Sequence, residues 1–173
     1  MIDQELKQRA LTPAAKGEAA PREKILKLGK KITDVVDHKL GKVRAEDAEY
    51  WGLAGVVTDE MAGVALKMKV RKPMTLPEIV KATGKTAEEL EPLLYKMSCV
   101  GLLEYNWENP RREKQYVLPM FVPGSAEFFN MNKQQIAEHP EVTAFFERMT
   151  FLPLEHITAM VPPSLPGVRQ SAA

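Results

Sequence analysis

A chain of 173 residues has room for one domain of ordinary size with extensions, and a hydrophobic content of 45% is enough for a buried core. The 24 Lys and Arg residues almost balance the 23 Asp and Glu residues, so the chain lacks the basic excess typical of dedicated nucleic-acid binders. The single cysteine excludes an intramolecular disulfide, and it excludes an iron–sulfur cluster held by this chain alone, because such clusters need about four ligands.

The N-terminal part of the chain predicts an arm followed by helices. Residues 1–21 are polar and Ala-rich and lack the apolar core of a secretion signal, so we expect a flexible arm. Residues 22–43 place apolar side chains at helical spacing and lysines elsewhere, which predicts an amphipathic helix. Its lysines form either a solvated face or a contact for an anionic partner, and the helix is a candidate contact for a homodimer. With a further helix at residues 46–54, it forms a helical extension over residues 22–57.

Residues 58–122 predict a winged helix-turn-helix domain. The expected order is helix, short strand, helix, helix, strand, basic turn and strand, which is typical of this fold. Thr75 is followed three residues later by Glu78, and Thr86 is followed in the same way by Glu89. Both pairs fit the capping-box pattern, so each threonine is expected to cap one of the last two helices.

The strands of this domain are predicted from alternation and from Gly and Pro. Residues 70–74 form a short strand that should lie at a sheet edge, because Pro73 cannot donate a hydrogen bond. Gly101 is expected to close the third helix. Residues 102–107 and 115–121 alternate as a strand pair and predict the hairpin wing.

The C-terminal part of the chain is expected to be helical and then disordered. Within residues 123–161 we predict a segment capped by Ser125, a short helix at residues 140–149 and a turn of helix at residues 152–160. Residues 162–173 are rich in Pro and Ser and predict a disordered tail. The expected class is mainly α: three helices plus a small β-hairpin wing, with helical N- and C-terminal extensions.

The predicted hairpin carries the candidate partner-binding residues. Tyr105 and Trp107 share one face by the two-residue period of a strand. They form either a surface for a partner or a stacked ring, or they pack against the third helix. Arg111, Arg112 and Lys114 make the turn basic, which is either a solvated turn or a contact for DNA or protein.

The third helix of this domain differs from the wing in charge. In DNA-binding winged helices this helix lies in the major groove and presents Arg, Lys, Asn or Gln to the bases. Here the exposed face offers Glu88, Glu89 and Glu91, which phosphates would repel. Cys99, at the end of the helix, is expected to be a buried structural thiol.

No motif supports catalysis by this chain alone, so we expect no catalytic, cofactor-binding or metal-binding residues in it. His38, His139 and His156 do not have metal-ligand spacing, and no glycine-rich phosphate loop is found. No apolar run reaches the roughly 18 residues of a membrane span. We therefore expect a cytoplasmic protein with no membrane contact.

Three segments resemble the N-terminal region of a group of oxidoreductases from anaerobic bacteria: VTDEMAGVALKMKVRKPMTLPEIVKATGK, LLYKMSCVGLLEYNWENPRREKQYVLPMFVPGSAEFFNM and HPEVTAFFERMTFLPLEHITAMVPP. Those proteins join a winged-helix-like module to iron–sulfur domains, and some add an FAD- and pyridine-nucleotide-binding portion. The resemblance covers roughly residues 56–163 and implies a redox setting. In the family, the cluster cysteines and nucleotide-binding glycines lie downstream of the region matching Met160, where this chain reads SLPGVRQSAA.

The leading expectation is a non-catalytic interaction or regulatory module associated with an iron–sulfur or flavin electron-transfer oxidoreductase, with a redox subunit as partner. Two alternatives stay open. One is a winged-helix DNA-binding transcriptional regulator. The other is the N-terminal fragment of an iron–sulfur and FAD oxidoreductase. We expect no cofactor in this chain, and the iron–sulfur cluster and FAD that the resemblance implies would belong to a partner or to a downstream region.

Overall fold

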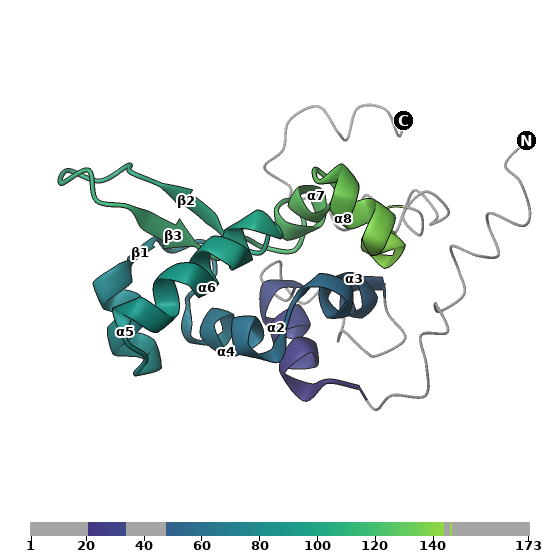
Figure 1. Cartoon of the computed structure of the whole chain (residues 1–173), viewed down its shortest axis with the longest axis horizontal. Coiled ribbons are helices and arrows are strands. Elements are labelled where there is room, and N and C mark those ends of the chain that lie inside the picture. Colours follow the sequence, from purple (N-terminus) through teal and green to yellow (C-terminus); the bar gives the residue numbers. More distant parts are fainter. Residues whose placement is uncertain (1–20, 34–47, 144–145, 147–173) are drawn as a thin grey trace, which may run out of the picture.

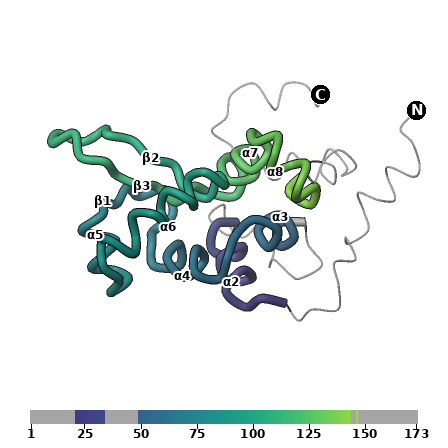
Figure 2. Tube along the Cα trace, in the orientation of Figure 1, coloured from purple at the N-terminus to yellow at the C-terminus, as the bar shows by residue number. Residues whose placement is uncertain are grey.

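The computed structural model describes residues 21–33, 48–143 and 146 (Figures 1 and 2). Within these ranges the chain is mainly helical, with a small three-stranded antiparallel sheet. The predicted arm except Pro21, the helical turn at residues 152–160 and the tail at residues 162–173 lie outside the described residues. In chain order the elements are α2 (Glu23–Thr33), α3 (Ala48–Val56), α4 (Asp59–Lys67), β1 (Met74–Thr75), α5 (Leu76–Thr83), α6 (Ala87–Cys99), β2 (Glu104–Asn106), β3 (Gln115–Val117), α7 (Ser125–Phe129), α8 (Lys133–Glu138) and the 3-10 helix η1 (Pro140–Thr143).

Helix α2 uses its apolar stripe inside the chain. Ile25, Leu28 and Ile32 are 0 to 1% exposed, and α2 packs against α3 and α4. The predicted amphipathic helix is therefore confirmed over this part. Residues 34–43, the rest of the helix considered for a homodimer, lie outside the described residues.

Polar anchors fix both ends of α2 to its neighbours. The Arg22 side chain donates to the carbonyls of Ala54 and Val57, at 3.2 and 2.9 Å. At the other end, the Lys31 ammonium donates to the carbonyls of Leu66, at 2.7 Å, and of Met68. These are the last carbonyls of α4, where the helix dipole favours a cation. Because both ends are held, α2 lies along α4.

The capping signals of α5 and α6 act as predicted. The Glu78 carboxylate accepts from the Thr75 backbone N–H at 2.7 Å and from its hydroxyl at 2.9 Å. At the start of α6, Glu89 accepts from the Thr86 backbone N–H at 2.8 Å, and the Thr86 hydroxyl accepts from the Glu89 N–H at 3.3 Å. Gly101 follows the C-cap of α6 with a φ of 88°, a left-handed conformation that favours glycine.

The sheet has the strand order β1-β3-β2, with Tyr105 opposite Tyr116 in the hairpin. The predicted strand at residues 70–74 is wrong in its bounds. Val70 forms only an isolated bridge to Leu118, and the following residues turn through Arg71, whose φ is 58°. Pairing therefore begins only after Pro73, at β1, which lies at the sheet edge as expected.

The hairpin strands are shorter than predicted. Leu102 and Leu103 were expected in the first strand, but their N–H groups donate to the Met97 carbonyl at the end of α6, at 2.9 and 3.2 Å. They close the helix and are not available for strand pairing. At the outer end, the Asn106 side-chain oxygen accepts from the Glu108 N–H at 3.0 Å and begins the wing turn.

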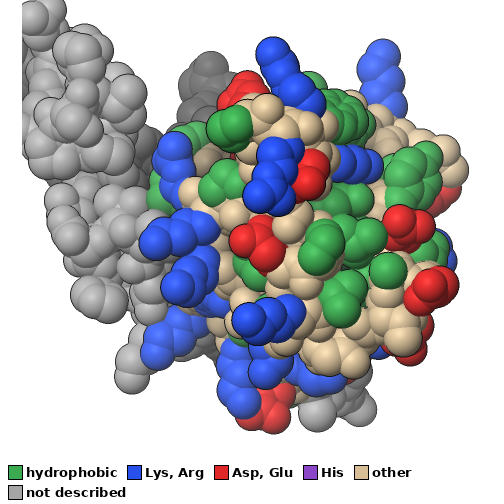
Figure 3. Space-filling view, turned by 90° about the vertical axis from the view of Figure 1, so that its left-hand side faces the viewer, with side chains coloured by type: hydrophobic (Ala, Val, Ile, Leu, Met, Phe, Trp, Pro, Cys, Tyr) green, Lys and Arg blue, Asp and Glu red, His purple; other side chains and the backbone are tan. Residues whose placement is uncertain are grey.

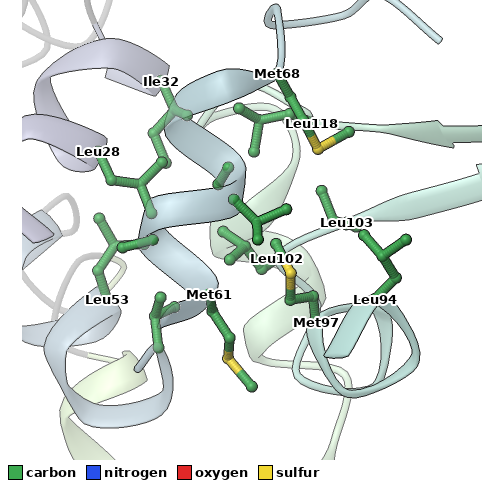
Figure 4. Close-up of a cluster of buried hydrophobic side chains, with 14 of the residues drawn as sticks. Leu28, Ile32, Leu53, Met61, Met68, Leu94, Met97, Leu102, Leu103 and Leu118 are labelled. Atoms are coloured by element: carbon green, nitrogen blue, oxygen red, sulfur yellow. The ribbon is translucent and has the colours of Figure 1, made fainter. Parts of the chain in front are cut away.

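One hydrophobic cluster joins the N-terminal helices, the central helices and the sheet. Figure 4 shows side chains from α2, α3 and α4 meeting those from α6 and from the segments before β2 and after β3. Each fully buried large side chain contributes about 1.5–3 kcal/mol. The residues labelled in Figure 4 are Leu28, Ile32, Leu53, Met61, Met68, Leu94, Met97, Leu102, Leu103 and Leu118.

The C-terminal helices differ from the prediction at their caps. Ser125 is the first residue of α7 and not its cap, which is Gly124. The Gly124 N–H donates to the Glu127 carboxylate at 2.6 Å, and a Cβ at Gly124 would lie 2.4 Å from the Met120 carbonyl oxygen. Only glycine fits this position. Of the helix predicted at residues 140–149, the described part before Phe146 is the 3-10 helix η1.

Candidate docking surface

Four large hydrophobic side chains are exposed in the part of the chain that the structure describes. Tyr95, on α6, is 66% exposed; Tyr105 and Trp107, on β2 and just beyond it, are 49 and 48% exposed; Met131, between α7 and α8, is 77% exposed. Single exposed hydrophobic side chains are common on protein surfaces, but a contiguous group marks an interaction site. These four side chains therefore mark such a site only if they lie together.

Contacts connect the four side chains. The rings of Tyr105 and Trp107 meet edge to face, with centroids 5.6 Å apart and an interplanar angle of 88°. Tyr95 lies four residues before Cys99 on α6, so the two side chains share one face of the helix, and the influence of Cys99, with a smaller one from Tyr105, raises the pKa of the Tyr95 hydroxyl. Cys99, Tyr105 and Met131 line one open hollow of about 410 Å³. We call these five residues, Tyr95, Cys99, Tyr105, Trp107 and Met131, the aromatic surface.

The strand period explains why the hairpin rings are exposed. By the two-residue period, Leu103 before β2, Tyr105 within it and Trp107 just beyond it face the same side, and Leu103 is only 3% exposed. Tyr116, which pairs with Tyr105, is 6% exposed. The face that belongs to the core at Leu103 thus becomes accessible further along the wing. The sequence left two alternatives for these rings, packing against the third helix or contact with a partner. In the structure about half of each ring, Tyr105 and Trp107, remains exposed.

Lys114 borders the aromatic surface through its contact with Tyr105. Its ammonium lies 4.5 Å from the ring centre of Tyr105 and 5.1 Å from that of Tyr116. A cation this close to a ring face is attracted by about 0.5–1 kcal/mol at an exposed site. The structure therefore brings Tyr105, Trp107 and Lys114, three of the five predicted contact residues, to one place.

Arg111 and Arg112 lie at the tip of the wing. The turn is held by Asn109, whose side chain donates to the Glu113 carbonyl at 2.6 Å and accepts from the Glu113 N–H at 3.1 Å. Arg112 adopts a left-handed conformation with φ 55°. Arg111 forms an ion pair with Glu113 at 3.9 Å, but both side chains are exposed, so the pair contributes little. Both arginines are thus available to a partner.

The outer face of α6 is acidic at its start and aromatic at its end. Glu88, Glu89 and Glu91 are all exposed, as predicted. Glu89 is tied to the helix cap, and its hydrogen bond from the Thr86 backbone lowers the pKa of its carboxyl. This face lacks the Arg, Asn and Gln side chains that read base edges.

Cys99 is exposed, so the prediction of a buried thiol is wrong. The buried face of α6 carries Leu90, Leu94 and Met97, and two further residues along a helix place Cys99 on the opposite side. The same helical period places Tyr95 outward. This period was available in the sequence and could have identified both residues. Met131 had no comparable signal, because it lies in an irregular connection.

No other cluster in the described ranges suggests chemistry. No three His, Cys, Asp or Glu side chains gather there in a way that could hold a metal ion. His139 lies near the buried Glu141, with 3.6 Å between Nδ1 and Oε1, while His38 and His156 fall outside the described residues. None of the helices described has the length and apolar character required to cross a lipid bilayer.

Comparisons with known proteins identify no relatives. No protein-family model matches the chain, and neither a curated protein nor a solved structure matches it. The resemblance to oxidoreductases of anaerobic bacteria therefore stays a prediction.

Proposed function

We propose that the protein is a non-catalytic interaction module with a winged-helix arrangement, and that the aromatic surface is where its partner binds. The observation that carries this proposal is the grouping of all four exposed large hydrophobic side chains of the described residues on one surface. Tyr, Trp and Met are enriched in protein interfaces, and Trp and Tyr are frequent among the residues that dominate binding.

The order of elements supports the winged-helix part of the proposal. Helix α4, strand β1, helices α5 and α6, and strands β2 and β3 follow one another in the order expected for this fold. The antiparallel order β1-β3-β2 supports it as well, because a hairpin with one short strand beside it is the small sheet expected of this fold. Helix α6 then takes the position of the third helix, at which many winged helices contact their ligands.

The charges around the aromatic surface define the partner that would fit. The acidic residues Glu88 and Glu91 lie toward the start of α6, and Arg111 and Arg112 lie at the wing tip. A complementary surface would have an apolar centre with basic groups on one side and acidic groups on the other. Following the resemblance, we propose an iron–sulfur or flavin redox subunit as this partner, with its cofactors in that subunit or in a downstream region of the same polypeptide.

A sequence-reading DNA regulator is the weaker alternative. Base recognition by α6 would bring Glu88 and Glu91 against phosphates, and the exposed C-terminal half of the helix presents Tyr95 and Cys99. Lys96 is the one basic side chain of α6, and the helix has no Arg, Asn or Gln for a bidentate contact to a base. An oxidoreductase fragment differs only in that the surface would bind a domain of its own polypeptide.

The test is anaerobic co-purification of the tagged chain from its native host, followed by mass spectrometry. We expect an iron–sulfur or flavin protein at near-stoichiometric yield with the unaltered chain. Tyr105→Ala combined with Trp107→Ala should abolish that recovery. The control, Lys133→Ala with Gln134→Ala, changes two exposed residues of α8 and should leave it unchanged.

Each other outcome contradicts a stated part of the proposal. Equal recovery of the partner by the Tyr105 and Trp107 double variant would refute the docking surface. Recovery of particular DNA sequences in preference to others, without a redox protein, would favour the regulator, because only the regulator has to read bases. If Arg111→Glu combined with Arg112→Glu recovered as much partner as the unaltered chain, the wing tip would lie outside the interface. The aromatic surface would still be assigned to it.

A further inference from the structure

Positive charge is concentrated in two segments of the described chain. Residues 22–33 and 67–72 together hold nine Lys and Arg residues and one carboxylate, Glu23. The other described residues hold seven Lys and Arg residues against thirteen Asp and Glu residues. The near-zero net charge of the whole chain therefore hides a strong separation of charge. The nine cations are Arg22, Lys24, Lys27, Lys30, Lys31, Lys67, Lys69, Arg71 and Lys72.

The two segments form one surface. Helix α2 packs along α4, and Lys31 contacts the end of α4, from which residues 67–72 continue. Lys24 and Lys67 line the same hollow, of about 300 Å³, together with Asp59 and Glu60, whose carboxylates pair with Arg22 and Lys85. In Figure 3, many Lys and Arg side chains lie along the left and lower edges of the face shown, with others at its top and centre, while hydrophobic and several acidic side chains lie to the right.

Six of the nine cations are exposed and have no ion pair with any described residue. Arg22 pairs with Asp59 at 2.7 Å, Lys27 pairs with Glu23 at 2.5 Å, and Lys31 is occupied by the carbonyls of α4. The remaining six form what we call the basic surface: Lys24, Lys30, Lys67, Lys69, Arg71 and Lys72. These charges are available to a ligand.

The turn at residues 69–72 is fixed by the backbone. Arg71 has a φ of 58°, and its N–H donates to the Leu118 carbonyl at 2.8 Å. The Lys72 N–H donates to the Lys69 carbonyl at 3.2 Å. A non-glycine residue in this conformation costs on the order of 1 kcal/mol, which these bonds offset. Three cations are therefore presented from a defined turn.

The composition of the basic surface identifies the chemistry of its ligand. Five of its six side chains are lysines, which are depleted in protein interfaces but bind phosphates as point charges. All four exposed large hydrophobic side chains of the described residues belong to the aromatic surface, so the basic surface offers no ring for base stacking. Insertion into lipid is also disfavoured, because the apolar stripe of α2 is buried in the protein.

We propose that the basic surface binds the phosphate backbone of double-stranded nucleic acid without reading its sequence. A duplex carries one charge per about 3.4 Å along each strand, and α2 rises about 9 Å between residues 24 and 30. The helix and the turn can therefore contact several phosphates at once. Binding of this kind is driven by counterion release.

The test uses the full chain and two unrelated 20-base-pair duplexes with a fluorescent label, followed by anisotropy. We expect equal affinity for the two sequences and a loss of about a thousandfold between 50 and 200 mM salt, as for about six phosphate contacts. Lys69→Glu with Lys72→Glu should weaken binding at least tenfold at 50 mM salt and reduce the salt slope by about two. Lys96→Glu with Lys133→Glu makes the same change in net charge elsewhere and should have little effect.

Three results would overturn the proposal. The first is no binding at low salt, and the second is an equal loss in the control variant, which would make the effect one of total charge. The third is binding to vesicles containing phosphatidylserine but not to either duplex, which would make the ligand a membrane surface. The Tyr105 and Trp107 double variant should bind duplex like the unaltered chain, so failure here and failure of the docking proposal are distinguishable.

Discussion

Trp107→Ala should weaken partner binding far more than it weakens folding. Tyr and Trp bury about 150–250 Å² when fully covered, and Trp107 is 48% exposed. A partner that covers the exposed half would remove about 100 Å² from water, or about 2.5 kcal/mol at ~25 cal/mol/Å². That energy corresponds to a loss of about 70-fold in affinity. The buried half and the edge-to-face contact with Tyr105 contribute to the folded protein and set the smaller effect on stability.

The assay compares two variants by two measurements. Affinity for the recovered partner is measured by titration calorimetry, and the free energy of unfolding by urea denaturation. Tyr116→Ala is the matched control, because Tyr116 is buried opposite Tyr105 and its removal should cost about 3–5 kcal/mol of stability. Unchanged affinity in Trp107→Ala, or a stability loss as large as that of Tyr116→Ala, would refute the assignment of Trp107 to an interface.

Three further predictions test the described structure. Hydrogen bonds from Thr75 lower the pKa of Glu78 below its usual 4.5, so the ionised carboxylate stabilises the fold above that pH, and this stability is lost as the pH falls through the lowered pKa. Glu78→Gln should therefore lower the melting temperature at pH 7, and the difference from the unaltered chain should vanish in acid. Gly101→Ala should lower the melting temperature of the protein more than Gly84→Ala does. Both glycines have a positive φ, but a Cβ added at Gly101 would lie 2.7 Å from a side chain of α7, whereas one added at Gly84 would meet nothing within 4 Å. Cys99 should react with a maleimide in the native protein, and bound partner should protect it; a thiol that reacts only after unfolding would contradict its exposure.

Local signals predicted the caps of the central helices. The pairs Thr75 with Glu78 and Thr86 with Glu89 lie within four residues of one another, so the sequence contains the whole motif. Gly101 is similar, because a left-handed residue after a helix favours glycine wherever the helix lies. The cap of α7 was predicted wrongly at Ser125 because the pattern of cap residues favours serine. Gly124 precedes it, and the close approach of the Met120 carbonyl, which selects glycine, is a contact that the cap pattern does not contain.

Exposure on the hairpin could not be predicted in the same way. Alternation places Tyr105 and Trp107 on the same face as Leu103, but it does not say where the core ends beneath that face. In the structure Leu103 is buried and the two rings are half exposed. The position of that boundary depends on how far the core packed around α6 extends beneath the hairpin, which is a tertiary property. The sequence therefore placed Tyr105 and Trp107 on the hairpin without deciding between packing and docking.

The basic surface shows why net charge is a weak guide to partners. Composition argued against a nucleic-acid ligand because the chain is nearly neutral. Binding, however, depends on the local field, which decays over about 8–10 Å in physiological salt, so carboxylates further away do not cancel these cations. The aromatic and basic surfaces share no residue, and changes at independent sites with no shared partners usually add within about 0.5 kcal/mol. A single chain could then hold a protein partner and a duplex together, and the two affinities measured separately should change little when both ligands are present.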